Sequence, residues 1–276
     1  MTLALSFEAC LLLLCAIALW SMGCATQKVE SGGIHSPERQ SETEYALAKD
    51  YFYKGDPRAA LDHSLRSVQL YPENPRALYF TSTLFLYFCS DITHQGMQNP
   101  DCRMADAEKY ARLAVKSEPR FRDAKNLLGQ TLILETKYKE AIDVLRPLVE
   151  DPAYSSNFLA WGNLGWAQVL SGELDSGITS LKNAVTQPRF CVGHYRLGLA
   201  YEKKGDLAEA ETSLNNAVQV PSPDCQNLQD AWEELGRVRA KLGKPEDARA
   251  DFQRCKEIST ESPSGRRCVQ LLEAKP

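Results

Sequence analysis

Residues 198–221 read GLAYEKKGDLAEAETSLNNAVQVP and show how this chain is organised. Apolar residues recur at helical spacing on both sides of the Gly-Asp pair at 205–206, and a proline closes the segment. This pattern predicts two amphipathic helices separated by a tight turn. Related stretches begin at residues 50, 129, 165 and 236, so the same unit returns at intervals of about 34 residues.

Small residues at fixed places in the unit predict how its two helices pack. Glycine in the middle of a helix costs about 1 kcal/mol relative to alanine. This cost is expected where a second helix crosses so closely that no side chain fits. The mid-helix glycines are Gly129, Gly165, Gly198 and Gly236. A second set follows the first helix, where glycine adopts the left-handed C-cap conformation: Gly55, Gly172, Gly205 and Gly243. The second helices supply the close approach through Ala60, Ala107, Ala141, Gly177, Ala210 and Ala248.

This unit resembles the tetratricopeptide repeat, which has a Leu-Gly pair on its first helix, Gly-Asp at the turn and a closing proline. The resemblance implies an all-α fold, a right-handed superhelical solenoid of about six repeats. We place the repeats within 41–260, at 41–74, 75–121, 122–157, 158–190, 191–224 and 229–260. The second repeat lacks the Leu-Gly pair and carries an insertion at 89–102. Residues 261–276 are expected to form a capping helix and tail, because a solenoid needs its open end covered.

The N-terminus has the features of an export signal. Ala9 to Trp20 is almost purely apolar but spans only 12 residues, whereas a membrane-spanning helix needs about 20; residues 1–23 therefore read as a signal peptide. Gly23-Cys24 resembles the lipobox of bacterial lipoproteins, which implies cleavage before Cys24 and lipidation of its thiol. Residues before this run carry no Lys or Arg, and Glu8 is acidic. Ordinary cleavage without lipid and a retained membrane anchor stay open as alternatives.

Residues 24–40 are polar and lack periodicity, so the lipidated cysteine is expected to be followed by a flexible tether.

The cysteine count agrees with export to an oxidising compartment. Of the nine cysteines, two fall in the predicted signal and one is Cys24, which leaves an even number. The repeat register places them in neighbouring pairs and favours one of fifteen connectivities: Cys89–Cys102, Cys191–Cys225 and Cys255–Cys268. Without CxxC or CxxH spacing a zinc site is not expected.

No catalytic constellation is found, and we expect neither enzymatic activity nor a cofactor. The sequence lacks the serine-hydrolase, zinc-protease and phosphate-loop motifs. Glu135, Glu233 and Glu234 are interpreted as solvated carboxylates on helix surfaces. His194 takes the place of the first aromatic residue of its repeat, which favours packing over a ligand role. A net charge of −4 and the isolated Arg266-Arg267 pair give no reason to expect nucleic-acid binding.

The inner surface of the solenoid is the remaining candidate site. In the repeat class that this chain resembles, five positions of each first helix line the concave face. Those positions hold Tyr45, Phe52, Tyr53, Tyr79, Leu86, Tyr87, Asn126, Gln130, Ile133, Leu159, Trp166, Val169, Leu170, Tyr195 and Leu199. Such an aromatic groove favours a protein partner that offers an extended or helical apolar segment. Few Lys or Arg fall at these positions, so a basic clamp for acidic peptide ends is not expected.

A lipobox, a tether and six repeats together resemble the pilotins, outer-membrane lipoproteins that assist type IV pilus biogenesis. That resemblance implies a protein anchored in the outer membrane by lipid, with its repeats in the periplasm and its groove on a subunit of the secretin ring. Two alternatives stay open: a scaffold for outer-membrane protein insertion or for peptidoglycan enzymes, and a regulatory subunit of a periplasmic enzyme.

Overall fold

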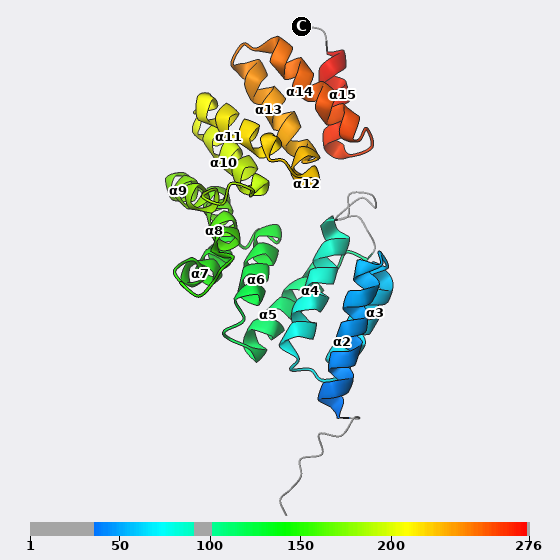
Figure 1. Cartoon of the computed structure of the whole chain (residues 1–276). Coiled ribbons are helices and arrows are strands. Elements are labelled where there is room, and N and C mark those ends of the chain that lie inside the picture. The colour runs from blue at the N-terminus through cyan, green and yellow to red at the C-terminus, as the bar shows by residue number, and fades with distance from the viewer. Residues whose placement is uncertain (1–35, 91–100, 275–276) are drawn as a thin grey trace, which may run out of the picture.

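The computed structural model describes residues 36–90 and 101–274, and within them all regular secondary structure is helical (Figure 1). The predicted signal peptide, Cys24 and most of the predicted tether lie outside the described residues. The helices are α2 (Pro37–Tyr53), α3 (Pro57–Leu70), α4 (Pro75–Ser90), α5 (Met104–Ser117), α6 (Arg122–Leu134), α7 (Tyr138–Val149), α8 (Asn157–Ser171), α9 (Leu174–Ala184), α10 (Cys191–Lys204), α11 (Leu207–Gln219), α12 (Pro223–Gln226), α13 (Gln229–Lys241), α14 (Pro245–Ile258) and α15 (Pro263–Glu273). The all-α prediction is confirmed.

Helices pair in sequence order as the repeat pattern predicts. The six pairs are α2–α3, α4–α5, α6–α7, α8–α9, α10–α11 and α13–α14, and α15 packs on the last pair. Each first helix also packs against the first helix of the next pair. Second helices of neighbouring pairs are joined in at least one place by an ion pair, Arg112 of α5 to Glu140 of α7 at 2.6 Å. The first helices therefore form the inner layer of an arc that bulges toward α7–α9 (Figure 1).

The first repeat begins earlier than the predicted boundary at residue 41. Ser36 caps α2 by accepting a hydrogen bond from the Arg39 N–H at 3.3 Å, and Pro37 takes the first helical position. Glu38 adds an acidic side chain to the first turn, where the helix dipole favours negative charge. Residues 37–40 thus belong to the folded array, and the predicted tether is correspondingly shorter.

The mid-helix glycines lie where a second helix crosses, as predicted. A methyl group at Gly129 would sit 2.5 Å from Leu145 Cγ, inside contact distance. Gly198 and Gly236 face Leu214 and Phe252 in the same way. In the fourth pair the approach is backbone to backbone, since a methyl group at Gly165 would lie 2.9 Å from the carbonyl oxygen of Gly177.

The turn between the two helices of a pair uses a left-handed residue. Gly55, Gly172, Gly205 and Gly243 have φ between 74° and 95°. Thr136 holds the equivalent place in the third pair with φ of 61°, the one positive φ of a non-glycine residue in the described chain. A β-branched residue is unfavourable in this conformation.

All three predicted disulfides are present. Cys89–Cys102 joins the end of α4 to the residues before α5, with 4.4 Å between the Cα atoms. Cys191–Cys225 links α10 to α12, and Cys255–Cys268 links α14 to the capping helix α15. The bonds therefore connect segments that follow one another along the array.

The apolar core thickens from the first pair toward the middle. Large clusters of buried Leu, Ile, Val and Ala run through α7, α8, α10, α11 and α13. In contrast, the contact of the first pair with its neighbours includes a polar seam. Ser41 Oγ is hydrogen-bonded to Ser67 Oγ at 2.9 Å and accepts a second bond from Asn74 Nδ2 at 2.9 Å. The hydroxyl groups of Ser64 and Thr81 are hydrogen-bonded at 2.6 Å.

Candidate functional site: the inner surface of the first helices

All predicted groove residues lie on the first helices, but they differ in exposure. Tyr53, Tyr87 and Gln130 are exposed, whereas Tyr45, Phe52, Tyr79, Asn126, Leu159, Trp166, Leu170, Tyr195 and Leu199 are half-buried. The prediction is wrong for Leu86, Ile133 and Val169, which are buried in the core. Val169 shows the reason for this burial: its side chain packs directly against Gly177 of α9, where an added methyl group would lie 2.6 Å from Val169 Cγ2. This register position turns toward the second helix.

The N-terminal end of the inner layer carries a connected group of rings. We call Tyr45, Phe52, Tyr53, Phe80 and Tyr87 the aromatic surface. The Phe52 ring lies 5.8 Å from Phe80 and 5.4 Å from Tyr87, and Tyr45 lies 5.9 Å from Phe80, all edge to face. Tyr53 is 82% exposed and Tyr87 39% exposed. Rings that hold one another in place while remaining accessible form a preorganised apolar surface for a partner.

Phe80 was absent from the predicted groove, because it is not at one of the five register positions that define the concave face in the repeat class. Its ring nevertheless joins Tyr45 to Phe52, so it belongs to the same surface. Its place in the sequence directly after Tyr79, one of the lining positions, was the available signal.

The middle of the inner layer contains a hydrogen-bonded polar ladder beside its apolar side chains. Asn163 of α8 donates a hydrogen bond to Asn126 Oδ1 of α6 at 3.1 Å, and Arg196 of α10 donates to Asn163 Oδ1 at 2.8 Å. The Arg196 guanidinium also lies 6.0 Å from the ring of Trp166. This Asn-Asn-Arg ladder across three first helices was missed, since neither Asn163 nor Arg196 occupies a predicted lining position.

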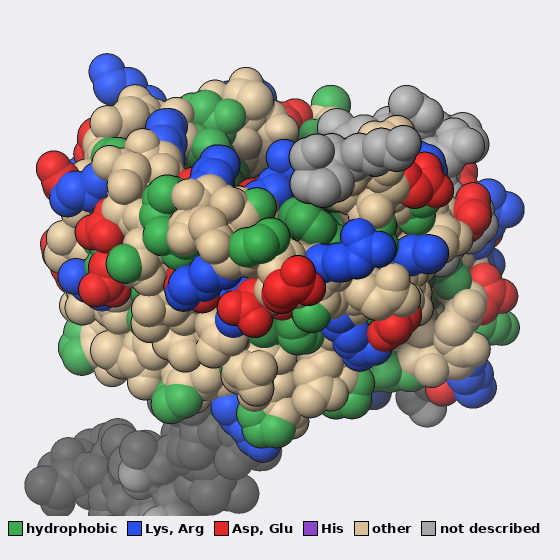
Figure 2. All heavy atoms as spheres, turned by 90° about the horizontal axis from the view of Figure 1, so that it is seen from above, with side chains coloured by type: hydrophobic (Ala, Val, Ile, Leu, Met, Phe, Trp, Pro, Cys, Tyr) green, Lys and Arg blue, Asp and Glu red, His purple; other side chains and the backbone are tan. Residues whose placement is uncertain are grey.

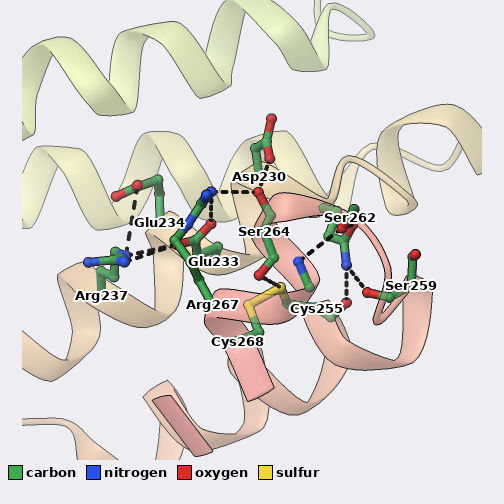
Figure 3. The surroundings of a disulfide bond; sticks show 12 residues. Asp230, Glu233, Glu234, Arg237, Cys255, Ser259, Ser262, Ser264, Arg267 and Cys268 are labelled. Carbon is green, nitrogen blue, oxygen red and sulfur yellow. Dashed lines mark hydrogen bonds and ion pairs between the residues drawn. A yellow bond between two sulfur atoms is a disulfide. The ribbon is translucent and has the colours of Figure 1, made fainter. Parts of the chain in front are cut away.

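At the C-terminal end, the interpretation of Glu233 as a solvated carboxylate is wrong. The residue is 1% exposed, and its carboxylate accepts two hydrogen bonds from Arg267 of α15, at 2.7 and 2.6 Å, and one from Arg237 at 3.1 Å (Figure 3). Burial alone would raise the pKa of Glu233, but the bonds from the two arginines lower it below its usual value. No local pattern in the sequence signals this contact, because Arg267 lies 34 residues away.

The other carboxylates and His194 are also more enclosed than solvated surface groups. Burial raises the pKa of Glu234, and the charge of Glu202 adds to the increase. Glu135 is half-buried beside Glu108 and Lys137, and its pKa is raised first by burial and then by Glu108. His194 is half-buried, and burial lowers its pKa, in agreement with the packing role predicted for it.

Within residues 36–90 and 101–274 no three His, Cys, Asp or Glu side chains come together as a metal site. None of the helices in those ranges combines the length and the apolar character needed to cross a bilayer. A surface hollow of about 460 Å³ is lined by residues 136–140, Ser171 and Glu173, away from the aromatic surface. On the face drawn in Figure 2, acidic and basic side chains alternate with small apolar groups, so this face shows no broad basic area.

Comparison with known proteins gives the fold and one local sequence match. Residues 195–263 match the family described as tetratricopeptide repeat. No curated protein matches the chain by sequence at a significant level.

In structure the chain is similar to PilW, described as a widely conserved type IV pilus biogenesis factor, with a TM-score of 0.67 and 18% identity over 83% of this chain and 98% of that one. It is also similar to pilF of Pseudomonas aeruginosa, with a TM-score of 0.62 and 14% identity over 85% and 99% of the two chains. A chain of the anaphase-promoting complex assembly Cut9–Hcn1 gives a TM-score of 0.67 at 15% identity, covering 87% and 44%. At these identities the likeness concerns the fold, and the described chain is a tetratricopeptide-repeat-like solenoid.

Proposed function

We propose that this protein is an outer-membrane lipoprotein that holds a segment of a protein partner on its inner surface and assists assembly of a type IV pilus secretin. The observation that carries the proposal is the aromatic surface, with accessible rings at one end of an otherwise closely packed array. Tetratricopeptide-repeat folds act as scaffolds for protein interactions. The fold similarity to PilW and pilF, over nearly their whole lengths, supports a role in pilus biogenesis.

Deletion of the gene provides the direct test. Heat-resistant secretin multimers, detected by immunoblotting of membrane fractions, are expected to fall while the amount of secretin monomer is maintained. Normal multimers together with normal pili would contradict the proposed role and favour another envelope scaffold or an enzyme regulator. In that case the protein captured with the chain, such as a peptidoglycan hydrolase, would identify the alternative.

The aromatic surface gives a sharper test with purified protein. A Tyr53→Ala/Tyr87→Ala variant should bind the secretin subunit at least about 10-fold more weakly, since exposed aromatic anchors commonly contribute about 1–2 kcal/mol or more each. Helical circular dichroism should not change, because Tyr53 is 82% exposed and neither tyrosine belongs to the buried core. Lys139→Ala/Arg146→Ala on the exposed face of α7 is the matched control. Equal binding by both double variants would place the partner on another surface.

Lipidation at Cys24 is tested separately by metabolic labelling with palmitate. Label should appear in the wild-type protein and disappear in Cys24→Ser, and the wild-type protein should fractionate with the outer membrane. Label that persists in Cys24→Ser would overturn this assignment without affecting the binding surface.

A further inference from the structure

The guanidinium of Arg196 donates only some of the hydrogen bonds that it could make to the described residues. Nη1 donates to the Gly162 carbonyl at 3.2 Å and to Asn163 Oδ1 at 2.8 Å, both on α8. Nε and Nη2 have no partner among the described residues. These two atoms form one edge of the planar guanidinium, and that edge matches the two oxygens of a carboxylate.

No carboxylate of the described chain pairs with Arg196. Acidic residues of α10 itself and of α13, the next first helix, have other cations: Glu202 pairs with Lys241 at 2.6 Å, and Glu233 with Arg267 at 2.6 Å. Glu234 lies 4.0 Å from Arg237. A guanidinium largely removed from water is costly unless a counter-charge is present. Burial lowers the pKa of Arg196 to about 10, so the side chain remains charged at neutral pH.

The unpaired edge of Arg196 is nevertheless not completely enclosed. Within the described residues, the only sealed side-chain nitrogen or oxygen without a partner is Tyr154 Oη. The Nε and Nη2 atoms of Arg196 are therefore not sealed, and Arg196 as a whole is half-buried. The position thus combines a charge largely removed from water with two donor atoms that are not fully enclosed, on a helix of the inner layer.

A second cation follows on the same face of α10. Lys203 lies two turns after Arg196, and its Nζ donates to the Val169 carbonyl at 3.1 Å. No ion pair joins Lys203 to a carboxylate of the described residues. Arg196 and Lys203 thus place two cations without a paired carboxylate on one face of α10.

We propose that Arg196 is the receptor for a Glu or Asp side chain of the partner segment that lies along the inner surface. The inference rests on the proposed function, because it assumes that a segment occupies this surface, and it adds what that segment must carry. An internal acidic side chain is favoured over a terminal carboxylate. Arg196 sits on the fifth of six first helices, so the inner layer continues on both sides of it.

A peptide selection on the purified protein tests the inference whichever protein the partner is. Random dodecapeptides fused through their carboxyl ends present no free C-terminus, so any acidic preference reports side chains. Selection should enrich Glu or Asp at one fixed distance from an aromatic or apolar residue. A selected peptide should bind Arg196→Met about 10- to 100-fold more weakly, as expected for a lost charged hydrogen-bonded pair.

Three controls assign the effect to the Arg196–carboxylate contact. Replacing the acidic residue of the peptide by its amide should weaken binding to the wild type but add no further loss in Arg196→Met. Arg146→Met, on the outer layer, should bind normally. The melting temperature of Arg196→Met should stay within about 2 °C of the wild type, and Arg196→Lys, which keeps the charge but not the fork, should bind with intermediate affinity.

The outcomes separate the inference from the function on which it rests. Peptides that need Tyr53 and Tyr87 but show no acidic preference, or that bind Arg196→Met normally, would overturn the role of Arg196 and leave the proposed function standing. If affinity and melting temperature fall together in Arg196→Met and Arg196→Lys, Arg196 is structural and the inference is wrong. Selection that yields no binder to the inner surface would remove both.

Discussion

Thr136 adopts a left-handed backbone conformation that is unfavourable for threonine. The same turn is glycine in four other pairs, and each of those glycines has a positive φ. A left-handed conformation costs an ordinary L-residue about 1–2 kcal/mol, and the third pair accepts this cost in the described chain.

Thr136→Gly should therefore stabilise the protein by about 1 kcal/mol, because it removes the strain but adds flexibility to the unfolded chain. The measurement is the urea midpoint followed by circular dichroism. Gly205→Thr, at the equivalent turn of the fifth pair, should shift the midpoint in the opposite direction. A lower midpoint for Thr136→Gly would show that the threonine side chain makes a stabilising contact.

At the scale of the element, α15 is joined to the array by both covalent and ionic contacts. The Cys255–Cys268 bond fixes it to α14, and the Glu233–Arg267 pair fixes it to α13 (Figure 3). Gln229 of α13 also accepts a hydrogen bond from Ser262, the N-cap of α15, and donates to the carbonyls of Cys255 and Ser259 at 2.6 Å. The open end of the apolar core is thereby covered.

Glu233→Gln should lower the free energy of unfolding at pH 7 by about 2 kcal/mol, since it weakens hydrogen bonds that involve charged partners. The pKa of Glu233 is lowered in the folded state, so its contribution is present above the unfolded value of 4.5 and is lost as the pH falls below it. The difference between wild type and variant should narrow accordingly in urea titrations at decreasing pH. Glu246→Gln, exposed on α14, is the control; a difference that stays constant with pH would contradict the assignment.

The helix pairs could be predicted from the sequence because their determinants are local. The Gly129–Leu145 and Gly165–Gly177 crossings follow from residues a fixed distance apart in one repeat. The disulfides followed from the same register. Arg196 and Glu233 could not be assigned in this way, because their environments depend on side chains of other helices. The burial of Glu233, for instance, requires the docking of α15.

At the scale of the whole molecule, packing is uneven along the array. The first pair buries no large side chain of its own: the buried residues of α2 are Ser41 and Ala48, and those of α3 are Ala60, Ser64 and Ser67. The middle pairs instead bury many Leu, Ile and Val residues. Because apolar burial is the main stabilising contribution to folding, the array should not open uniformly.

Amide hydrogen exchange followed by mass spectrometry should show this difference. Amides of α2 and α3 are expected to exchange well before those of α8, α10 and α11, which lie in the large clusters. Equal protection along the chain would mean that the polar seam is as stable as the apolar core.

The polar seam also determines how the molecule would respond to a mechanical load. Given the lipid anchor proposed at Cys24, a pull between membrane and partner enters the fold through α2. The hydrogen bonds of Ser41 and Asn74, together with the ring contacts of Phe52 on α4, would then bear it before the large buried clusters do. The first covalent cross-link along the chain that the structure describes is Cys89–Cys102. The first helix pair would therefore open under tension before the repeats beyond it. Opening would separate Tyr45 and Phe52 of α2 from Phe80 and Tyr87 of α4, so the aromatic surface would weaken its hold on a partner as the load rose.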